Sequence, residues 1–173
     1  TASACELICP ATFEAITGNK AITRLFEPLS NPEIEHIAVA NRAHLFLIAP
    51  ATANIIAKAA AGIADDWLST TLLATRAPVL FAPAMNTSMY EHPATQENIR
   101  ILKQRGCHFI GPDSGRLACA TVGAGRMADP SHIVEFALTL LDPRDDLKNV
   151  RILITSGPTR EPIDPVRFIS NRS

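Results

Sequence analysis

The sequence predicts an α/β protein with a doubly wound parallel sheet and helices on both of its faces. Three short segments are continuously apolar instead of alternating, which is typical of parallel strands buried on both sides. They are residues 44–49 (HLFLIA), 78–82 (PVLFA) and 107–110 (CHFI). Patterns typical of helices separate them, and this alternation predicts right-handed crossovers between parallel strands.

Five segments before, between and after these strands have the apolar spacing and the end signals of helices. The clearest has Thr52 as a suitable cap at its start and Gly62 as the residue that ends it. Proline in the opening turn favours another helix start at residue 93. The expected helices cover residues 10–17, 52–61, 66–75, 93–105 and 131–141.

The last thirty or so residues differ in character from the rest. Residues 142–149 (DPRDDLKN) are charged and contain proline, which predicts a linker. Residues 151–155 have the pattern of a new strand, and a proline-rich loop follows them. We therefore expect a first domain over residues 1–141, the linker, and the beginning of a second domain over residues 150–173.

Composition excludes several classes of protein. Of the 173 residues, 47% are hydrophobic and the formal net charge is −1, which argues against disorder and against binding of nucleic acid. No apolar run approaches the length of a membrane span. The four cysteines lack a dense disulfide pattern, which favours reduced thiols in the cytoplasm. Cys5 and Cys9 have no second ligand pair for zinc, so we expect core residues and no metal.

The candidate site follows the strands, because open parallel sheets bind ligands beyond the carboxyl ends of their strands. Thr52 and the helix start after the first strand could hold a phosphate, Asn86 follows the second strand, and Cys119 lies in the glycine-rich segment 111–127. Each also has an ordinary explanation. Thr52 and Asn54 can cap a helix, Asn86 can belong to a turn, and Cys119 can be an incidental loop thiol. Their expected convergence on one edge favours function.

Several motifs resemble those of a known enzyme family. The segments PATAN (50–54), PAMN (83–86) and LAC (117–119), with GAGRM (123–127), are similar to those of the flavin-dependent cysteine decarboxylases. They are most similar to the phosphopantothenoylcysteine decarboxylases of coenzyme A biosynthesis. Residues 154–173 (ITSGPTREPIDPVRFISNRS) resemble the start of the phosphopantothenate–cysteine ligase domain, which many bacteria fuse behind the decarboxylase.

This resemblance implies a flavodoxin-like, Rossmann-like fold of three α/β/α layers. The family's glycine-rich first strand–helix turn has no counterpart in this sequence, so the fold is expected to lack its first strand here. The resemblance further implies FMN as the cofactor, and CTP and Mg²⁺ as requirements of the ligase domain. It also implies a homotrimer with the active site at a subunit interface, or a dodecamer built from trimers.

Carried over residue by residue, the resemblance assigns three catalytic residues: the histidine His36, the substrate-binding asparagine Asn86 and the proton-donating cysteine Cys119. His36 also has an ordinary explanation as a solvated helix residue, because Glu33 and Glu35 precede it in a polar stretch. The cofactor contacts implied by the resemblance are Thr1, Ala2, Ser3, Thr52, Ala53, Asn54, Ile55 and Ala84.

The activity implied by the resemblance is FMN-dependent decarboxylation of a small molecule, 4′-phospho-N-pantothenoyl-L-cysteine, to 4′-phosphopantetheine. The full-length polypeptide is then expected also to ligate cysteine to 4′-phosphopantothenate with CTP. Two alternatives remain: a noncatalytic flavoprotein scaffold or regulatory subunit, and a decarboxylase of peptides that end in cysteine. The joint presence of His36, Asn86 and Cys119 favours an enzyme, and the ligase-like tail favours the pantothenate pathway.

Overall fold

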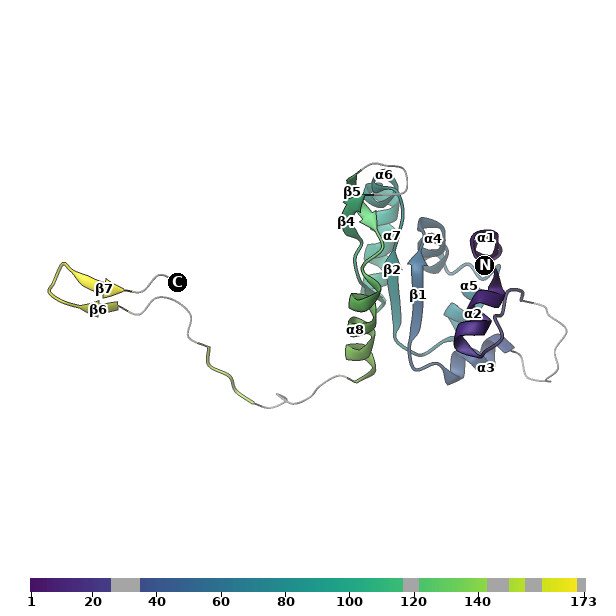
Figure 1. Ribbon diagram of the computed structural model, residues 1–173, viewed down its shortest axis with the longest axis horizontal. Helices are drawn as coiled ribbons and strands as arrows, with labels where there is room; N and C mark the ends of the chain where they lie inside the picture. The colour runs from purple at the N-terminus through teal and green to yellow at the C-terminus, as the bar shows by residue number, and fades with distance from the viewer. Residues whose placement is uncertain (26–34, 117–121, 143–149, 155–159, 171–173) are drawn as a thin grey trace. The chain divides into compact units, whose positions relative to one another are not determined.

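The computed structural model describes residues 1–25, 35–116, 122–142, 150–154 and 160–170. The chain divides into two compact units, Thr1–Pro143 and Arg144–Ser173. Figure 1 shows the helices and strands of each unit. The parallel sheet lies in the first unit, as do the turns that follow its strands.

The sheet consists of three parallel strands in the order β1 (Phe46–Ala51), β2 (Val79–Pro83) and β3 (His108–Phe109). The predicted strands are confirmed, although β1 begins two residues later than expected. Its ladder with β2 starts where the N–H of Phe46 donates to the carbonyl of Pro78, at 2.9 Å. This order places β2 in the centre of the sheet.

Helices cover both faces of β2, which confirms the predicted α/β layering at the centre of the sheet. The expectation of burial on both faces is wrong for β1, where Ile48 is buried but Leu47, on the other face, is 43% exposed. Phe81 of β2 is fully buried against α4 (Ala53–Ala61) and α7 (Pro93–Gln104). The next residue, Ala82, packs with Ala128 and with Ile133 of α8, on the opposite face. Because successive strand residues point to opposite faces, α8 (Pro130–Leu141) lies across the sheet from α4 and α7.

The structure confirms the predicted ends of two helices. Helix α2 (Pro10–Thr17) ends at Gly18, whose φ of 67° is left-handed. Helix α4 is capped by Thr52 and ends at Gly62, with φ of 72°. Glycine adopts this conformation without steric cost, so it ends a helix where other residues would be strained.

Helix α5 (Trp67–Ala74) starts with a reciprocal cap. The Asp66 carboxylate accepts from the N–H of Ser69 at 2.8 Å, and the Ser69 hydroxyl accepts from the N–H of Asp66 at 3.1 Å. Partial burial opposes ionisation of Asp66, but the hydrogen bonds from Ser69 and Lys58 outweigh it and lower the pKa of this carboxyl. The cap therefore stabilises the fold above the ordinary pKa of 3.8, and loses its effect as the pH falls through the lower folded-state value.

Asp66→Ala is expected to reduce the free energy of unfolding by about 1 kcal/mol at neutral pH, because the start of α5 loses its cap. Chemical denaturation measures this change. The matched control is Asp65→Ala, which removes an exposed partner of Lys58 and a long hydrogen bond from the Ser69 hydroxyl, at 3.4 Å, but leaves the cap of α5 in place. It should change stability by less than about 0.5 kcal/mol. Equal losses in the two variants would contradict the capping role.

Several short elements lie outside the helix and strand ranges expected from the sequence, although the ordinary explanation of His36 already placed that residue in a helix. Three are the helices α1 (Ala2–Leu7), α3 (Glu35–Arg42) and α6 (Thr87–Glu91). The other is an antiparallel hairpin of β4 (Asp113–Arg116) and β5 (Val122–Arg126), within the segment predicted as a glycine-rich loop. Hydrogen bonds between backbone groups hold the two strands together. A glycine-rich strand has no alternating apolar side chains, so the sequence contains no signal for this hairpin.

Two predictions about other parts of the chain were wrong. Residues 151–154 form no strand: Leu153 is 90% exposed and Ile154 is 81% exposed, so this apolar run is not buried as a strand. The described elements of the second unit are instead the hairpin strands β6 (Arg160–Pro162) and β7 (Phe168–Ser170). Cys9 is exposed and not in the core, because it lies at the start of α2; Cys5 is half-buried.

Within the described residues, no helix is both long enough and apolar enough to cross a membrane. The same residues contain no group of three or more side chains suited to hold a metal ion. Residues 143–149, which make up most of the predicted linker, lie outside the described part, and Asp142 ends α8.

Candidate functional site

The carboxyl ends of β1 and β2 lie side by side. Ala51 is paired with Pro83, and the N–H of Ala84 donates to the carbonyl of Ala51 at 2.9 Å. Thr52 and Ala84 are therefore the first residues beyond two adjacent strand ends. The structure thus brings together two of the segments that the sequence places in the cofactor site.

The turn after β1 leads directly into α4. The Thr52 hydroxyl accepts from the N–H of Ile55 at 3.4 Å. Thr52 therefore caps α4, which is the structural role that the sequence also allowed. Thr52 and Asn54 are exposed, Ala53 is half-buried, and the side chain of Ile55 is packed in the core. The first N–H groups of a helix have no partner within it and attract negative groups. This helix start is therefore suited to bind an anionic or polar edge of a ligand.

Asn86 is exposed in the turn after β2, where its side-chain oxygen accepts from the N–H of Ser88 at 2.9 Å and caps α6. A carboxamide also carries two N–H donors, which suit a carboxylate. The β4–β5 hairpin contacts this turn, because the N–H of Met85 donates to the carbonyl of Gly125 at 2.9 Å. Asn86 is thus held between a strand end, a helix start and a hairpin.

Cys119 lies outside the described residues. It belongs to the connection, residues 117–121, between β4 and β5. The two strands pair from Asp113 with Arg126 to Arg116 with Val122, and β5 contacts α6. The strands on both sides of Cys119 in the sequence therefore belong to the hairpin that meets the Asn86 turn.

His36 is half-buried near the start of α3, a helix that packs against α5. The hydroxyl of Thr75, which precedes β2, donates to the carbonyl of Ala40 in α3 at 3.3 Å. Figure 1 shows α3 at the amino end of β1 and α6 at the opposite end of the strands. Helix α3, which carries His36, therefore lies at the other end of the strands from α6, the helix that Asn86 caps.

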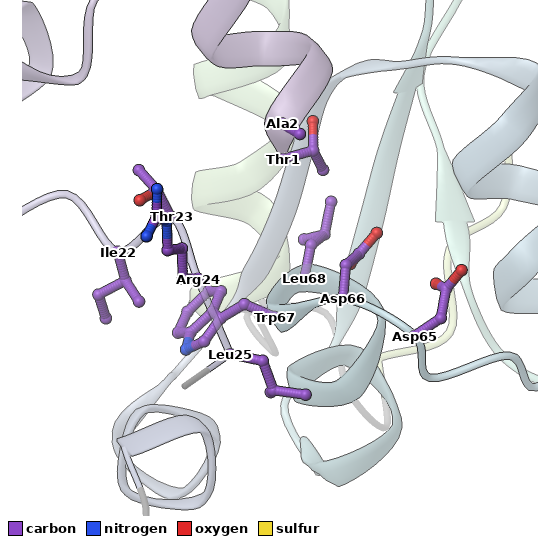
Figure 2. A pocket seen from close by; sticks show the side chains of 10 residues that line it. All are labelled: Thr1, Ala2, Ile22, Thr23, Arg24, Leu25, Asp65, Asp66, Trp67 and Leu68. Carbon is purple, nitrogen blue, oxygen red and sulfur yellow. The ribbon is translucent and has the colours of Figure 1, made fainter. Parts of the chain in front are cut away.

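A cavity of about 350 Å³ gathers other predicted residues (Figure 2). Thr1 and Ala2 line it together with residues 22–25 and 65–68. Thr1 also caps α1, with its hydroxyl accepting from the N–H of Ala4 at 3.3 Å, and Ser3 is exposed. None of the lining residues belongs to the turns after β1 and β2. The predicted cofactor contacts thus fall into two groups.

Sequence reasoning missed the close packing at the Asn86 turn. The hydroxyl of Thr87 is buried and has no hydrogen-bond partner among the described residues, and Gly123 lies directly against it. Gly123 and Gly125, two residues apart in the glycine-rich segment, were the available signal in the sequence. Their close approach to another segment depends on the folded hairpin, which the sequence pattern did not predict.

Two family models match the chain. One is described as Flavoprotein and matches residues 1–142. The other is described as DNA/pantothenate metabolism flavoprotein C-terminal domain and matches residues 147–173. The two matches follow one another along the chain, with a short interval inside the predicted linker.

Relatives match over the whole chain. The chain is 47% identical over 173 residues to the coenzyme A biosynthesis bifunctional protein CoaBC of Escherichia coli strain K12. It is 49% identical over 175 residues to the protein of the same name from Bacillus subtilis strain 168. Each match covers 100% of this chain and 43% of the relative. The chain therefore spans less than half the length of these relatives.

Solved structures share the fold. The FMN-dependent cysteine decarboxylase SpaF is 35% identical with a TM-score of 0.68, over 80% of this chain and 74% of that one. A cysteine-to-serine mutant of PPC decarboxylase, complexed with pantothenoylaminoethenethiol, is 32% identical with a TM-score of 0.63, over 68% of each chain. These likenesses agree with a flavodoxin-like arrangement of the sheet and its helices. With a family match over residues 1–142, the chain belongs to the Flavoprotein family.

Proposed function

We propose that this chain is an FMN-dependent decarboxylase that converts 4′-phospho-N-pantothenoyl-L-cysteine to 4′-phosphopantetheine. The observation that carries the proposal is the meeting of three segments at one end of the sheet: the turn after β1, the Asn86 turn and the β4–β5 hairpin. The proposal is further supported by relatives named for coenzyme A biosynthesis and by the likeness to PPC decarboxylase.

The residues at this edge fit FMN. The start of α4 offers backbone N–H groups that have no partner within the helix, and Ala53 and Ala84 place only small side chains beside the strand ends. Thr52 and Asn54 add exposed polar groups, and Thr1–Ser3 are proposed as a second set of contacts. When bound, FMN would take two electrons and a proton from the CH₂–SH group of the substrate and return them after carbon dioxide has left.

Asn86 is proposed to bind the substrate carboxylate through its amide hydrogens. Its side chain is already oriented by the cap on α6, so little rotational freedom is lost on binding. A neutral amide is better suited than an arginine, because tight binding of a charge that disappears in the reaction would raise the barrier. The residue therefore holds the substrate without stabilising the carboxylate more than the transition state.

Cys119 and His36 are proposed to move protons. Once the thiol-bearing carbon has been oxidised to a thioaldehyde, its sulfur can accept the electron pair of the breaking C–C bond. A protonated thiol at Cys119 can then donate to carbon, since an ordinary thiol is mostly protonated near neutral pH. His36 is proposed to exchange the substrate's sulfur proton, because an imidazole ring has one nitrogen that can donate a proton and one that can accept it.

The active site is proposed to lie between subunits of a homotrimer, or of a dodecamer built from trimers, in the cytoplasm. Support comes from α3, which carries His36 and lies at the other end of the strands from α6. A histidine from a neighbouring copy could reach the Asn86 edge.

We also propose a division of the chain into residues 1–141 as the decarboxylase domain, 142–149 as a linker and 150–173 as the start of a ligase domain. The second family match supports this division. CTP and Mg²⁺ would bind to parts of a longer polypeptide, since the chain spans 43% of its relatives. Residues 150–173 alone are expected to have no ligase activity.

The test of the proposed function uses the full-length polypeptide that carries this chain. FMN titration followed by visible absorbance should show binding, and the loaded protein should release one carbon dioxide for each 4′-phosphopantetheine formed. A protein that binds FMN without releasing carbon dioxide would instead be a noncatalytic flavoprotein. A protein that does not bind FMN would contradict the proposal altogether.

A second candidate substrate is a peptide with a carboxyl-terminal cysteine, because EpiD, which was solved with the substrate peptide DSYTC, is 25% identical to this chain with a TM-score of 0.67. The match of residues 147–173 to a pantothenate-metabolism domain favours the first substrate. Competition between the two acids in one reaction, followed by mass spectrometry, decides between them. Preferential turnover of the peptide would reverse the assignment.

A further inference from the structure

Two glycines of β5 touch the turn after β2 more closely than any other residue type would allow. A Cβ atom added to Gly123 would lie 2.5 Å from the hydroxyl oxygen of Thr87 and 3.1 Å from its methyl carbon. A Cβ added to Gly125 would overlap the backbone carbonyl oxygen of Met85, and the φ of Gly125 is +143°. Real Cβ atoms do not approach other atoms so closely. Residue 125 therefore must be glycine, and residue 123 must be glycine as long as the Thr87 side chain keeps its place.

These contacts hold the residues immediately before and after Asn86 in the sequence. Met85, the residue before it, donates its N–H to the carbonyl of Gly125 at 2.9 Å. Thr87, the residue after it, packs on Gly123. The backbone of Asn86 is thus fixed by the hairpin, and its side-chain oxygen is fixed by the N–H of Ser88.

We propose that Gly123 and Gly125 are positioning residues that set Asn86 for the substrate carboxylate. This inference rests on the proposed function, since it needs a ligand carboxylate at Asn86. The hairpin acts as a support for the turn, and only glycine lets its strand come near enough to reach Met85 and Thr87. A shift of the turn by a few tenths of an ångström would misalign a hydrogen bond whose strength depends on distance and angle.

The same hairpin offers a matched control. Gly115 of β4 is paired with Gly123, but a Cβ on Gly115 would meet only the flexible side chain of Arg126, at 3.3 Å, and no positive φ requires glycine there. Gly115→Ala therefore makes the same chemical change in the same hairpin without touching the Asn86 turn.

The experiment measures two constants in the full-length, FMN-loaded protein: KM for the acid substrate, and the inhibition constant of 4′-phosphopantetheine, which lacks the carboxylate. Gly123→Ala should raise KM about tenfold, the worth of a weakened hydrogen bond to a charged group, and leave the inhibition constant unchanged. Gly115→Ala should change neither constant. FMN affinity, measured by fluorescence, should be the same in all of these proteins.

A paired substitution identifies the contact itself. Thr87→Ala removes the hydroxyl and methyl that a Cβ at residue 123 would strike, and the hydroxyl has no hydrogen-bond partner among the described residues to lose. Gly123→Ala/Thr87→Ala should therefore recover most of the KM lost in Gly123→Ala alone. Amide hydrogen exchange gives a readout that does not depend on turnover: exchange at Met85 should accelerate in Gly123→Ala and slow again in the double variant.

If Gly123→Ala does not fold, Thr87→Ile enlarges the other side of the same contact and should give the same selective rise in KM.

Equal changes in the two constants, no change in either, or a selective change that Thr87→Ala fails to reverse would each overturn the inference. If the parent protein binds FMN but releases no carbon dioxide, the proposed function is wrong, and this inference is wrong with it. Normal turnover with an unaltered KM in Gly123→Ala contradicts the inference alone.

Discussion

Cys119→Ser is expected to stop the reaction after carbon dioxide has left. A serine hydroxyl is a much weaker acid than a thiol, so the carbon that loses carbon dioxide receives no proton. Without that proton the C=S group does not re-form, and the electrons cannot return to the sulfur-bearing carbon. Formation of 4′-phosphopantetheine should fall between about a hundredfold and ten-thousandfold, the usual range for loss of a general acid. Under anaerobic conditions, mass spectrometry should find a decarboxylated compound two hydrogens lighter than 4′-phosphopantetheine.

The absorbance of oxidised FMN provides a second readout of this variant. It should disappear when substrate is added without oxygen, and it should not recover as it does in the parent protein. Cys9→Ser is the control, because Cys9 is an exposed thiol at the start of α2 and should be replaceable without effect on turnover. Normal product formation by Cys119→Ser would remove this cysteine from the mechanism.

Asn86→Asp is expected to lower kcat/KM about a hundredfold while leaving the fold intact. Aspartate caps a helix as well as asparagine does, so the hydrogen bond from Ser88 to the side-chain oxygen, and with it α6, should persist. The substrate carboxylate, however, loses its amide donors and meets a second negative charge, a combined cost of about 3 kcal/mol. Steady-state kinetics and thermal unfolding, measured on the same preparation, separate the two effects.

Asn86→Ala is the complementary variant, because it removes both the cap and the amide donors. It should lose about 1 kcal/mol of stability as well as activity. If Asn86→Asp kept full activity, the assignment of the amide to the substrate carboxylate would be wrong. If it unfolded readily, the expected survival of the cap on α6 would be wrong, and Asn86→Ser, which also caps helices but offers no amide, would then test the assignment.

Most of the sheet and its covering helices could be predicted because their signals are local. Gly18 and Gly62 end α2 and α4 where the sequence indicates, since few other residues adopt a left-handed conformation readily. Strand β2 has a continuous apolar run because helices lie on both of its faces, whereas the equally apolar β1 leaves Leu47 43% exposed. The run at residues 151–154 has the same appearance, yet it forms no strand, because strand formation requires a pairing partner that a local pattern does not specify.

The candidate site was predictable only where it follows a strand. Thr52 and Ala84 lie together because parallel strands end at one edge, and Asn86 follows from the same rule. The hairpin contact at Gly123 and Gly125 depends on the approach of two distant segments, which the composition of a glycine-rich stretch does not encode. The position of His36 likewise depends on how α3 packs on α5, and not on its own sequence neighbours.

The most direct test of the central claim is a crystal structure of the full-length Cys119→Ser protein with FMN and 4′-phospho-N-pantothenoyl-L-cysteine. The account predicts FMN against residues 52–54 and Ala84, and the substrate carboxylate within hydrogen-bond distance of the Asn86 amide nitrogen. FMN bound at the amino end of the strands, or a carboxylate held by other residues with Asn86 turned away, would contradict it.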